Sequence, residues 1–480
     1  MAERLTFNYG AAPFGREVRG RATSREKAAL PDAAAPFLPP IERPDWAYWG
    51  VFAFTALLFF RPQDTVPLLA PLHLPEVAAI AALLAMLGHR LARRLPLVRG
   101  TPELAGIGAM ALVMLLTAPF SIWPGGAIST FLDVYIKVVL IFILMVNSIK
   151  GFKVLQQFTW LIVVAMGYVA ARGVLDYARG INLVRGERLH GSISGLMGNP
   201  NDLAMNMVTF LPFAVVMAMA RGRPLPRLAS GTIALLMLAT VLFTKSRAGL
   251  LGLVVMGIVL VVQMCKIRPG ITAMMIVGLL AASPFMPASL WARVSSIVNP
   301  AEDDTGSREA RKDLLRQGWQ TFLEHPLTGV GAGQFKNYNP PGRLEPWRET
   351  HNVVLQIATE LGIFGVLVFL YLLTRMVAAL FWTKRIFSRA AARAPAGTIA
   401  RPDAFRPEER EAMRLYLSAM AASFAGWLVC AQFASIGYYW TFYYLFALIL
   451  AARQITAERL DAARRALGRP APAWMEKRTA

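Results

Sequence analysis

His351 and Asn352 stand where a long polar segment meets a long apolar run, and the polar segment carries several basic residues: Arg308, Arg311, Lys312 and Arg316. A histidine titrates near neutral pH and can take a proton from an attacking hydroxyl. Guanidinium groups bind phosphate oxygens in pairs and keep their charge at any pH, which suits a pyrophosphate leaving group. The pattern predicts a reaction on a phosphate-linked substrate, with His351 as the general base.

Arg308, Arg311 and Lys312 lie three or four positions apart, so a helix would place them on one face where they can converge on one anion. The alternative interpretation is a solvated face balanced by neighbouring acids such as Glu309 and Asp313. Spacing alone leaves both open.

His351 has an alternative role as well, because a lone histidine at a helix start is commonly a capping or interfacial residue. Its position after an Arg-rich segment makes the catalytic role equally reasonable. Glu349 lies close enough in the sequence to orient His351 or tune its charge.

Arg247 opens a predicted helix in Thr244-Lys245-Ser246-Arg247-Ala248-Gly249. A helix N-terminus already favours anions, so we favour a phosphate contact over simple snorkelling to the membrane interface. Arg188 and Arg185 are further candidates for phosphate or sugar contacts. The nearby Asn199-Pro200-Asn201 is explained by helix capping alone.

The composition is that of a membrane protein, with 56% hydrophobic residues, 16% charged residues and a mean hydropathy of +0.46 over 480 residues. The net charge of +21 is spread among short loops and does not form one basic face, which argues against nucleic acid. Cys265 and Cys430 are far apart in apolar surroundings, so we expect neither a disulfide nor a metal site, and no cofactor.

Apolar runs predict an all-α, polytopic fold of about twelve spans, since a spanning helix needs about 20 apolar residues. The predicted spans are 46–60, 75–91, 103–122, 128–149, 154–175, 202–220, 228–244, 247–265, 270–288, 352–382, 413–434 and 436–453. Residues 1–45 form a basic, disordered arm and residues 454–480 a tail. One long loop, 289–351, contains a helix from Arg308 to Leu323 that we expect to lie on the membrane surface. His325-Pro326 ends it, and Gly329 to Gly333 predicts a flexible turn.

The positive-inside rule orients these spans with both termini cytoplasmic. On that orientation the cytoplasmic segments, counted with the adjoining helix ends, hold 34 of the 50 Lys and Arg residues. Three outer regions break the rule: the segment before the sixth span with Arg185 and Arg188, the turn with Lys245 and Arg247, and the loop 289–351. Basic residues that lie on the outer side despite the positive-inside rule suggest an anionic ligand on the outer face.

The chain resembles the O-antigen ligase and polymerase superfamily through several motifs in one order: Gly198-Asn199-Pro200-Asn201-Asp202-Leu203-Ala204, Ser246-Arg247-Ala248-Gly249, Arg311 to Trp319 running into His325-Pro326-Leu327-Thr328-Gly329-Val330-Gly331, and His351-Asn352 before Glu360-Leu361-Gly362. The resemblance covers about residues 100–450. It implies a GT-C-like bacterial inner-membrane glycosyltransferase with a periplasmic active site. Such proteins move a glycan whole from undecaprenyl pyrophosphate to an acceptor hydroxyl, with inversion and without a metal.

Carried over by motif, Arg247 and Arg311 look like the pyrophosphate-binding arginines, and His351 looks like the base. Arg308 could exchange roles with Arg311. The expected partners are the undecaprenyl-pyrophosphate-linked glycan donor, the lipid bilayer, and an acceptor that is lipid A–core or another glycan.

Three acceptors fit the same chemistry, and no residue distinguishes them. Lipid A–core makes the protein a ligase, another lipid-linked repeat makes it an O-antigen or exopolysaccharide polymerase, and a protein makes it an O-oligosaccharyltransferase. A membrane transporter or lipid flippase is the alternative from another class. It predicts repeated halves with ion sites near the midplane, and the sequence has no such pairing.

Overall fold

The computed structural model describes residues 44–191, 197–282, 291, 307–339, 348–388 and 405–466. The predicted arm, apart from Pro44 and Asp45, lies outside these ranges. The longer helices are α1 (Trp46–Phe60), α3 (Leu74–Ala92), α4 (Pro102–Thr117), α6 (Ile136–Ser148), α7 (Phe152–Ala178), α8 (Pro200–Met219), α9 (Pro224–Phe243), α10 (Arg247–Met264), α11 (Pro269–Ala282), α13 (Ser307–Glu324), α14 (Val353–Ile386), α16 (Pro407–Ala431) and α17 (Trp440–Ala466).

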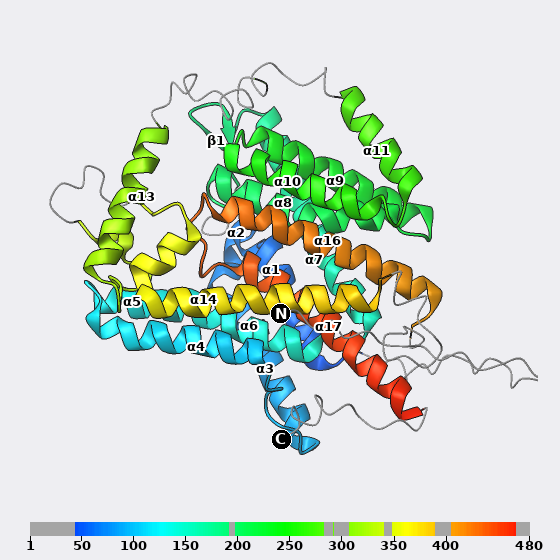
Figure 1. The fold of residues 1–480 in the computed structure, drawn as a ribbon, viewed down its shortest axis with the longest axis horizontal. Coiled ribbons are helices and arrows are strands. Elements are labelled where there is room, and N and C mark those ends of the chain that lie inside the picture. The colour runs from blue at the N-terminus through cyan, green and yellow to red at the C-terminus, as the bar shows by residue number, and fades with distance from the viewer. Residues whose placement is uncertain are drawn as a thin grey trace, which may run out of the picture.

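Short elements connect them: α2 (Pro62–Thr65), η1 (Pro67–Leu72), η2 (Ala118–Phe120), α5 (Pro124–Thr130), the π-helical turn η3 (Phe131–Tyr135) and η6 (Phe335–Asn337). A two-stranded antiparallel hairpin, β1 (Leu183–Val184) with β2 (Arg188–Leu189), follows α7. The described residues are thus almost entirely helical, as the sequence predicts (Figure 1).

Nine helical stretches within the described residues are long and apolar enough to cross a membrane: Leu68–Ala92, Pro102–Phe120, Pro124–Ser148, Phe152–Ala178, Pro200–Met219, Pro224–Phe243, Arg247–Met264, Val353–Ile386 and Pro407–Ala431. Each coincides with a predicted span. The other three predicted spans correspond to α1, which has 15 residues, to α11, whose described apolar stretch is Pro269–Gly278, and to α17. Nine of the approximately twelve predicted spans therefore correspond to helices that are long and apolar enough to cross a membrane.

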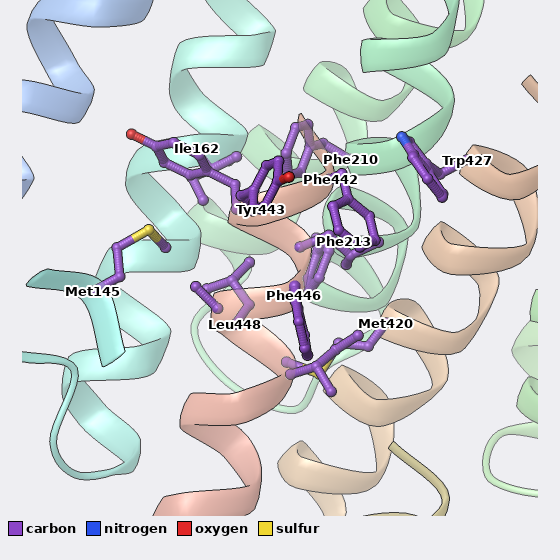
Figure 2. Packing of buried hydrophobic residues seen from close by; sticks show 14 of the residues in the cluster. Met145, Ile162, Phe210, Phe213, Met420, Trp427, Phe442, Tyr443, Phe446 and Leu448 are labelled. Carbon is purple, nitrogen blue, oxygen red and sulfur yellow. The ribbon is translucent and has the colours of Figure 1, made fainter. Parts of the chain in front are cut away.

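Helix α17 forms the centre of the core. Every residue from Phe442 to Ala452 is at most 2% exposed, so protein surrounds this apolar helix on all sides. Figure 2 shows α17 side chains among those of α6, α7, α8 and α16; the labelled residues are Met145, Ile162, Phe210, Phe213, Met420, Trp427, Phe442, Tyr443, Phe446 and Leu448. This helix continues to Ala466, into the region predicted as a tail.

Contacts between connecting segments divide into the two sets that the charge pattern predicts. Segments predicted outside meet one another through Ile122 N to Val330 O (3.1 Å), Arg188 Nε to Thr244 O (3.3 Å) and His351 N to Ser435 Oγ (3.0 Å). Segments predicted inside meet through Arg99–Glu458 (2.6 Å), Arg459–Glu409 (2.7 Å) and Arg268–Glu411 (2.5 Å). The candidate residues for chemistry all belong to the first set.

Helix α14 bends at Gly362, where the backbone has φ 66° and ψ −163°. The first part of α14 therefore turns away from the long remainder, toward α13 (Figure 1). Backbone groups near the bend bond to the segment after α13: Val330 N to Thr359 O (2.8 Å), Gly331 N to Glu360 O (3.0 Å) and Ile363 N to Pro326 O (2.8 Å). The glycines at 329–333 are thus a packed turn held against α14, and the prediction of a flexible turn is wrong.

We expect Gly362→Ala to destabilise the protein strongly. The positive φ costs a residue with a Cβ about 1–3 kcal/mol, and that Cβ would also overlap the Leu327 carbonyl oxygen. The thermal midpoint of the detergent-solubilised protein measures the effect. Gly257→Ala in α10, where an added Cβ meets nothing within 4 Å, is the control and should be neutral or slightly stabilising. Equal midpoints for the two variants would contradict the prediction.

Candidate active site

Helix α13 presents Arg311 on the face that packs against the first part of α14. Leu314 is 4% exposed and Thr321 is 2% exposed, and Gly318 leaves room for Leu355 of α14. These positions follow Arg311 at helical spacing, so the half-buried Arg311 shares their face. The sequence predicted Leu314, Leu315, Trp319, Phe322 and Leu323 on one side, but only Leu314 of these is buried, while Leu315, Trp319 and Leu323 are exposed.

His351 lies beside two guanidinium groups. Burial, followed by the positive charges of Arg311 and Arg348, lowers the pKa of His351 from 6.5 to about 4. The imidazole is therefore neutral at pH 7 and can accept a proton. Among the described residues, none forms a hydrogen bond with its ring. An anion placed between the ring and these arginines would raise the pKa of His351 again, because it offsets the charges that disfavour the imidazolium.

This arrangement predicts how His351 titrates. We expect NMR of histidine-labelled protein to give a pKa near 4 for His351 and a higher pKa in Arg311→Gln, since removing a nearby positive charge favours the protonated ring. The exposed Arg316 provides the control Arg316→Gln, which should leave the titration unchanged. A wild-type pKa near 6.5 would show that Arg311 does not act on the imidazole.

The backbone around His351 is held by the connection between α16 and α17. His351 has a left-handed φ of 50°, and its N–H donates to Ser435 Oγ at 3.0 Å. The buried Thr350 hydroxyl lies 3.0 Å from the same Ser435 oxygen. Asn352 caps α14 by accepting from Leu355 N at 2.9 Å and donates to the carbonyl oxygen of Gln432 at 3.3 Å. Together these contacts stabilise a left-handed backbone conformation that is uncommon for residues other than glycine.

We expect Ser435→Ala to loosen this segment, because a buried donor left without its acceptor costs about 1–3 kcal/mol. The measurement is faster amide hydrogen exchange at His351 together with a lower unfolding temperature. Ser435→Thr keeps the hydroxyl and should restore protection. If Ser435→Ala exchanges as slowly as the wild type, the hydroxyl does not hold His351.

Glu360, in the first part of α14, connects the glycine turn to the same segment. Its carboxylate accepts from Gly333 N at 2.9 Å and from Gln356 Nε2 at 3.5 Å, and Gln356 Oε1 accepts from Gly437 N at 3.0 Å. The residue is 5% exposed, so these partners replace water around a buried polar group. One side-chain network thus joins the turn after α13, the start of α14 and the α16–α17 connection.

A second group of polar residues surrounds the start of α10. Arg188 in β2 donates through Nε to Thr244 O at 3.3 Å and through Nη2 to Asn201 Oδ1 at 3.4 Å. Ser246 caps α10 by accepting from Gly249 N at 3.1 Å, and its hydroxyl bonds to Asn201 Oδ1 at 2.7 Å. Arg247 is the first residue of α10, as predicted. The hairpin therefore brings Arg188 to the turn that carries Arg247.

The two groups are connected through the start of α8. Asn199 caps this helix, accepting from Asn201 N and Asp202 N, both at 2.9 Å, while Asn201 faces Ser246. Burial, followed by the charges of Glu349, Asp202 and Glu360, raises the pKa of Tyr439 above its ordinary value. Asp202, in the first turn of α8, therefore lies near Glu349 of the His351 segment and near Tyr439 of the α16–α17 connection.

The predicted site residues fall at this one end of the structure with two differences from expectation. Glu349 acts on Tyr439, and none of the described contacts joins it to the His351 ring. Arg308 lies in the first turn of α13, where the structure does not describe side chains.

Several residues of this end were not predicted. Ser435 bonds to His351 and Gln432 bonds to Asn352. Tyr439, Glu360 and Asp202 lie near Glu349. Asp202 and Glu360 belong to quoted motifs, which was the only signal for them. Ser435, Gln432 and Tyr439 lie more than 75 residues after His351 and are in no motif. A sequence carries no local sign of such contacts.

Comparison with known families gives a match to part of the chain. The sequence model of the O-antigen ligase family matches residues 232–370, from α9 into the part of α14 beyond its bend. The matched segment contains Arg247, Arg311 and His351, while Arg188 and Ser435 lie outside it. Comparison with curated proteins and with solved structures gives no match.

Proposed function

We infer that this multi-pass membrane protein transfers a glycan from undecaprenyl pyrophosphate to an acceptor hydroxyl on the periplasmic face of the inner membrane. The match of residues 232–370 to the O-antigen ligase family confirms the resemblance to that superfamily. The observation that carries the proposal is the position of a neutral, half-buried histidine beside Arg311, at the same end of the bundle as the Arg188–Arg247 group. Lipid A–core is the proposed acceptor.

The proposed reaction is a single displacement. His351 takes the proton of the acceptor hydroxyl, whose oxygen attacks the anomeric carbon of the donor glycan. The bond between that carbon and the pyrophosphate oxygen breaks, and undecaprenyl pyrophosphate leaves with the electron pair. Arg247 and Arg311 stabilise the negative charge that develops on the leaving group, with Arg188 or Arg308 as further contacts. Attack opposite the leaving group inverts the anomeric centre.

The proposed topology places α1, α11 and α17 across the membrane as well, for about twelve spans in a GT-C-like arrangement with both termini cytoplasmic. Burial of α17 within the bundle supports its crossing, because protein and not lipid surrounds its polar residues. Accessibility of single cysteines introduced at the exposed Gln432 and Arg465, in a background without Cys265 and Cys430, to a membrane-impermeant reagent tests the sidedness. Labelling of both from the same side would contradict it.

A transfer assay with purified protein in proteoliposomes tests the function. The donor is an undecaprenyl-pyrophosphate-linked glycan carrying a label, offered together with lipid A–core. Label on lipid A–core supports the ligase. Longer lipid-linked chains would identify a polymerase instead, and label on an added protein would identify a protein O-oligosaccharyltransferase. No transfer to any of the three would overturn the glycosyltransferase proposal.

A further inference from the structure

Helix α13 carries an exposed apolar stripe beside the face that packs against α14. Leu315, Trp319 and Leu323 follow one another every four residues and are 42%, 55% and 59% exposed, and Leu327 beyond the helix end is 60% exposed. Residues four apart lie on one face of a helix. The cations Lys312 and Arg316 are exposed within the same turns. The helix therefore has a second, unoccupied face that is apolar with basic residues along it.

The stripe lies outside the nine candidate spans but next to one of them. Ile122 N donates to Val330 O at 3.1 Å, which joins the turn between α4 and α5 to the segment that follows Leu327. That turn exposes Phe120 (70%), Ile122 (43%) and Trp123 (58%), directly after the exposed Leu116 (62%) of α4. Aromatic residues at the end of a span mark the membrane interface. The end of α13 is thus connected to a site with an interfacial composition.

The direction of α13 agrees with this position. In Figure 1 the helix is steeply inclined to α4 and α14 and lies above their left-hand ends. A helix at a steep angle to the spans lies close to the membrane plane. Such a helix, with one apolar face and basic residues beside it, is typical of helices that bind the headgroup region of a bilayer.

We propose that α13 lies in the membrane interface, with Leu315, Trp319, Leu323 and Leu327 in the bilayer at the headgroup–acyl boundary and with Lys312 and Arg316 at lipid phosphates. The occupant of the exposed face is the lipid surface. Because the half-buried Arg311 lies four residues before Leu315, where the stripe borders the packed face, the bilayer sets the depth of this arginine. If the proposed function holds, that depth is the one at which the pyrophosphate of a polyprenyl donor lies.

Fluorescence quenching tests the lipid contact without any assay of activity. In a Cys265→Ser background, which removes the exposed native thiol, Leu323→Cys and the matched control Gln320→Cys are each labelled with an environment-sensitive fluorophore. The full chain is placed in nanodiscs of phosphatidylethanolamine and phosphatidylglycerol. We expect acyl-chain nitroxide lipids to quench the label at position 323 several-fold more than the label at 320, and aqueous iodide to do the reverse.

Equal iodide quenching at the two positions would overturn the inference, because both faces of α13 would then be in water. Since the labels report position and not chemistry, the result is independent of glycan transfer. Lipid contact at position 323 in a protein that transfers no glycan would keep the inference and remove the proposed function. Glycan transfer by a protein in which both labels are in water would keep the proposed function and remove the inference.

Discussion

His351→Ala is expected to lower the turnover rate of glycan transfer by about a hundred- to ten-thousandfold, the usual contribution of a positioned general base. The neutral imidazole, with its pKa lowered to about 4 by burial and by Arg311 and Arg348, is the proton acceptor that the mechanism needs. Affinity for the lipid-linked donor should change little, because the imidazole acts on the acceptor hydroxyl. Single-turnover transfer and donor-binding measurements on the same protein preparation separate the two quantities.

His89→Ala is the control for this prediction. It removes the same side chain from the end of α3, in the segment predicted to be cytoplasmic, and should transfer at the wild-type rate. If His351→Ala retained the wild-type turnover, His351 would not be the base. Loss of both folding and transfer would show a structural role for His351, and circular dichroism with thermal unfolding detects that outcome.

Arg247→Gln and Arg311→Gln are expected to weaken donor binding by about 10- to 100-fold each, since a hydrogen bond to a charged group contributes about 1.5–3 kcal/mol. Turnover should fall as well, because the charge on the pyrophosphate grows as the glycosidic bond breaks. The neutral amide keeps a polar group in place, so the effect reports mainly on charge. Equilibrium binding of the lipid-linked donor and initial rates at saturating donor measure the two effects.

Matched variants distinguish these arginines from the general basic charge of the outer end. Arg316→Gln changes an exposed residue of α13, and Arg179→Gln changes an exposed residue at the end of α7. Both should leave donor affinity within about twofold, as surface charges contribute little. Equal losses in all four variants would mean that donor binding depends on overall charge and not on a pocket formed by Arg247 and Arg311.

Much of the fold follows from local composition. A run of about 20 apolar residues must satisfy its backbone hydrogen bonds internally in lipid, so the sequence identifies it as a helix without knowledge of its neighbours. The start of α8 at Pro200, capped by Asn199, and the start of α10 at Arg247 follow from capping chemistry within three residues. Local rules failed at Gly329 to Gly333, where the partner of the turn is the bend of α14.

The same distinction applies to the candidate site. Residue type and order indicated Arg247, Arg311 and His351, and the family match covers all three. The sequence could not indicate that Ser435 holds His351, that Arg188 bonds to the turn before Arg247, or which face of α13 carries Arg311. Each of these depends on segments that are distant along the chain.

By itself, the sequence determined the helical class of the described residues, nine candidate spans, the separation of basic segments into two sets and the residue types suited to pyrophosphate chemistry. These properties depend on local hydrophobicity, capping and charge. Only the tertiary structure decided that Arg311 lowers the pKa of His351 and that α13 leaves an apolar stripe uncovered. Electrostatic effects and burial depend on distances in space, and helix packing sets those distances.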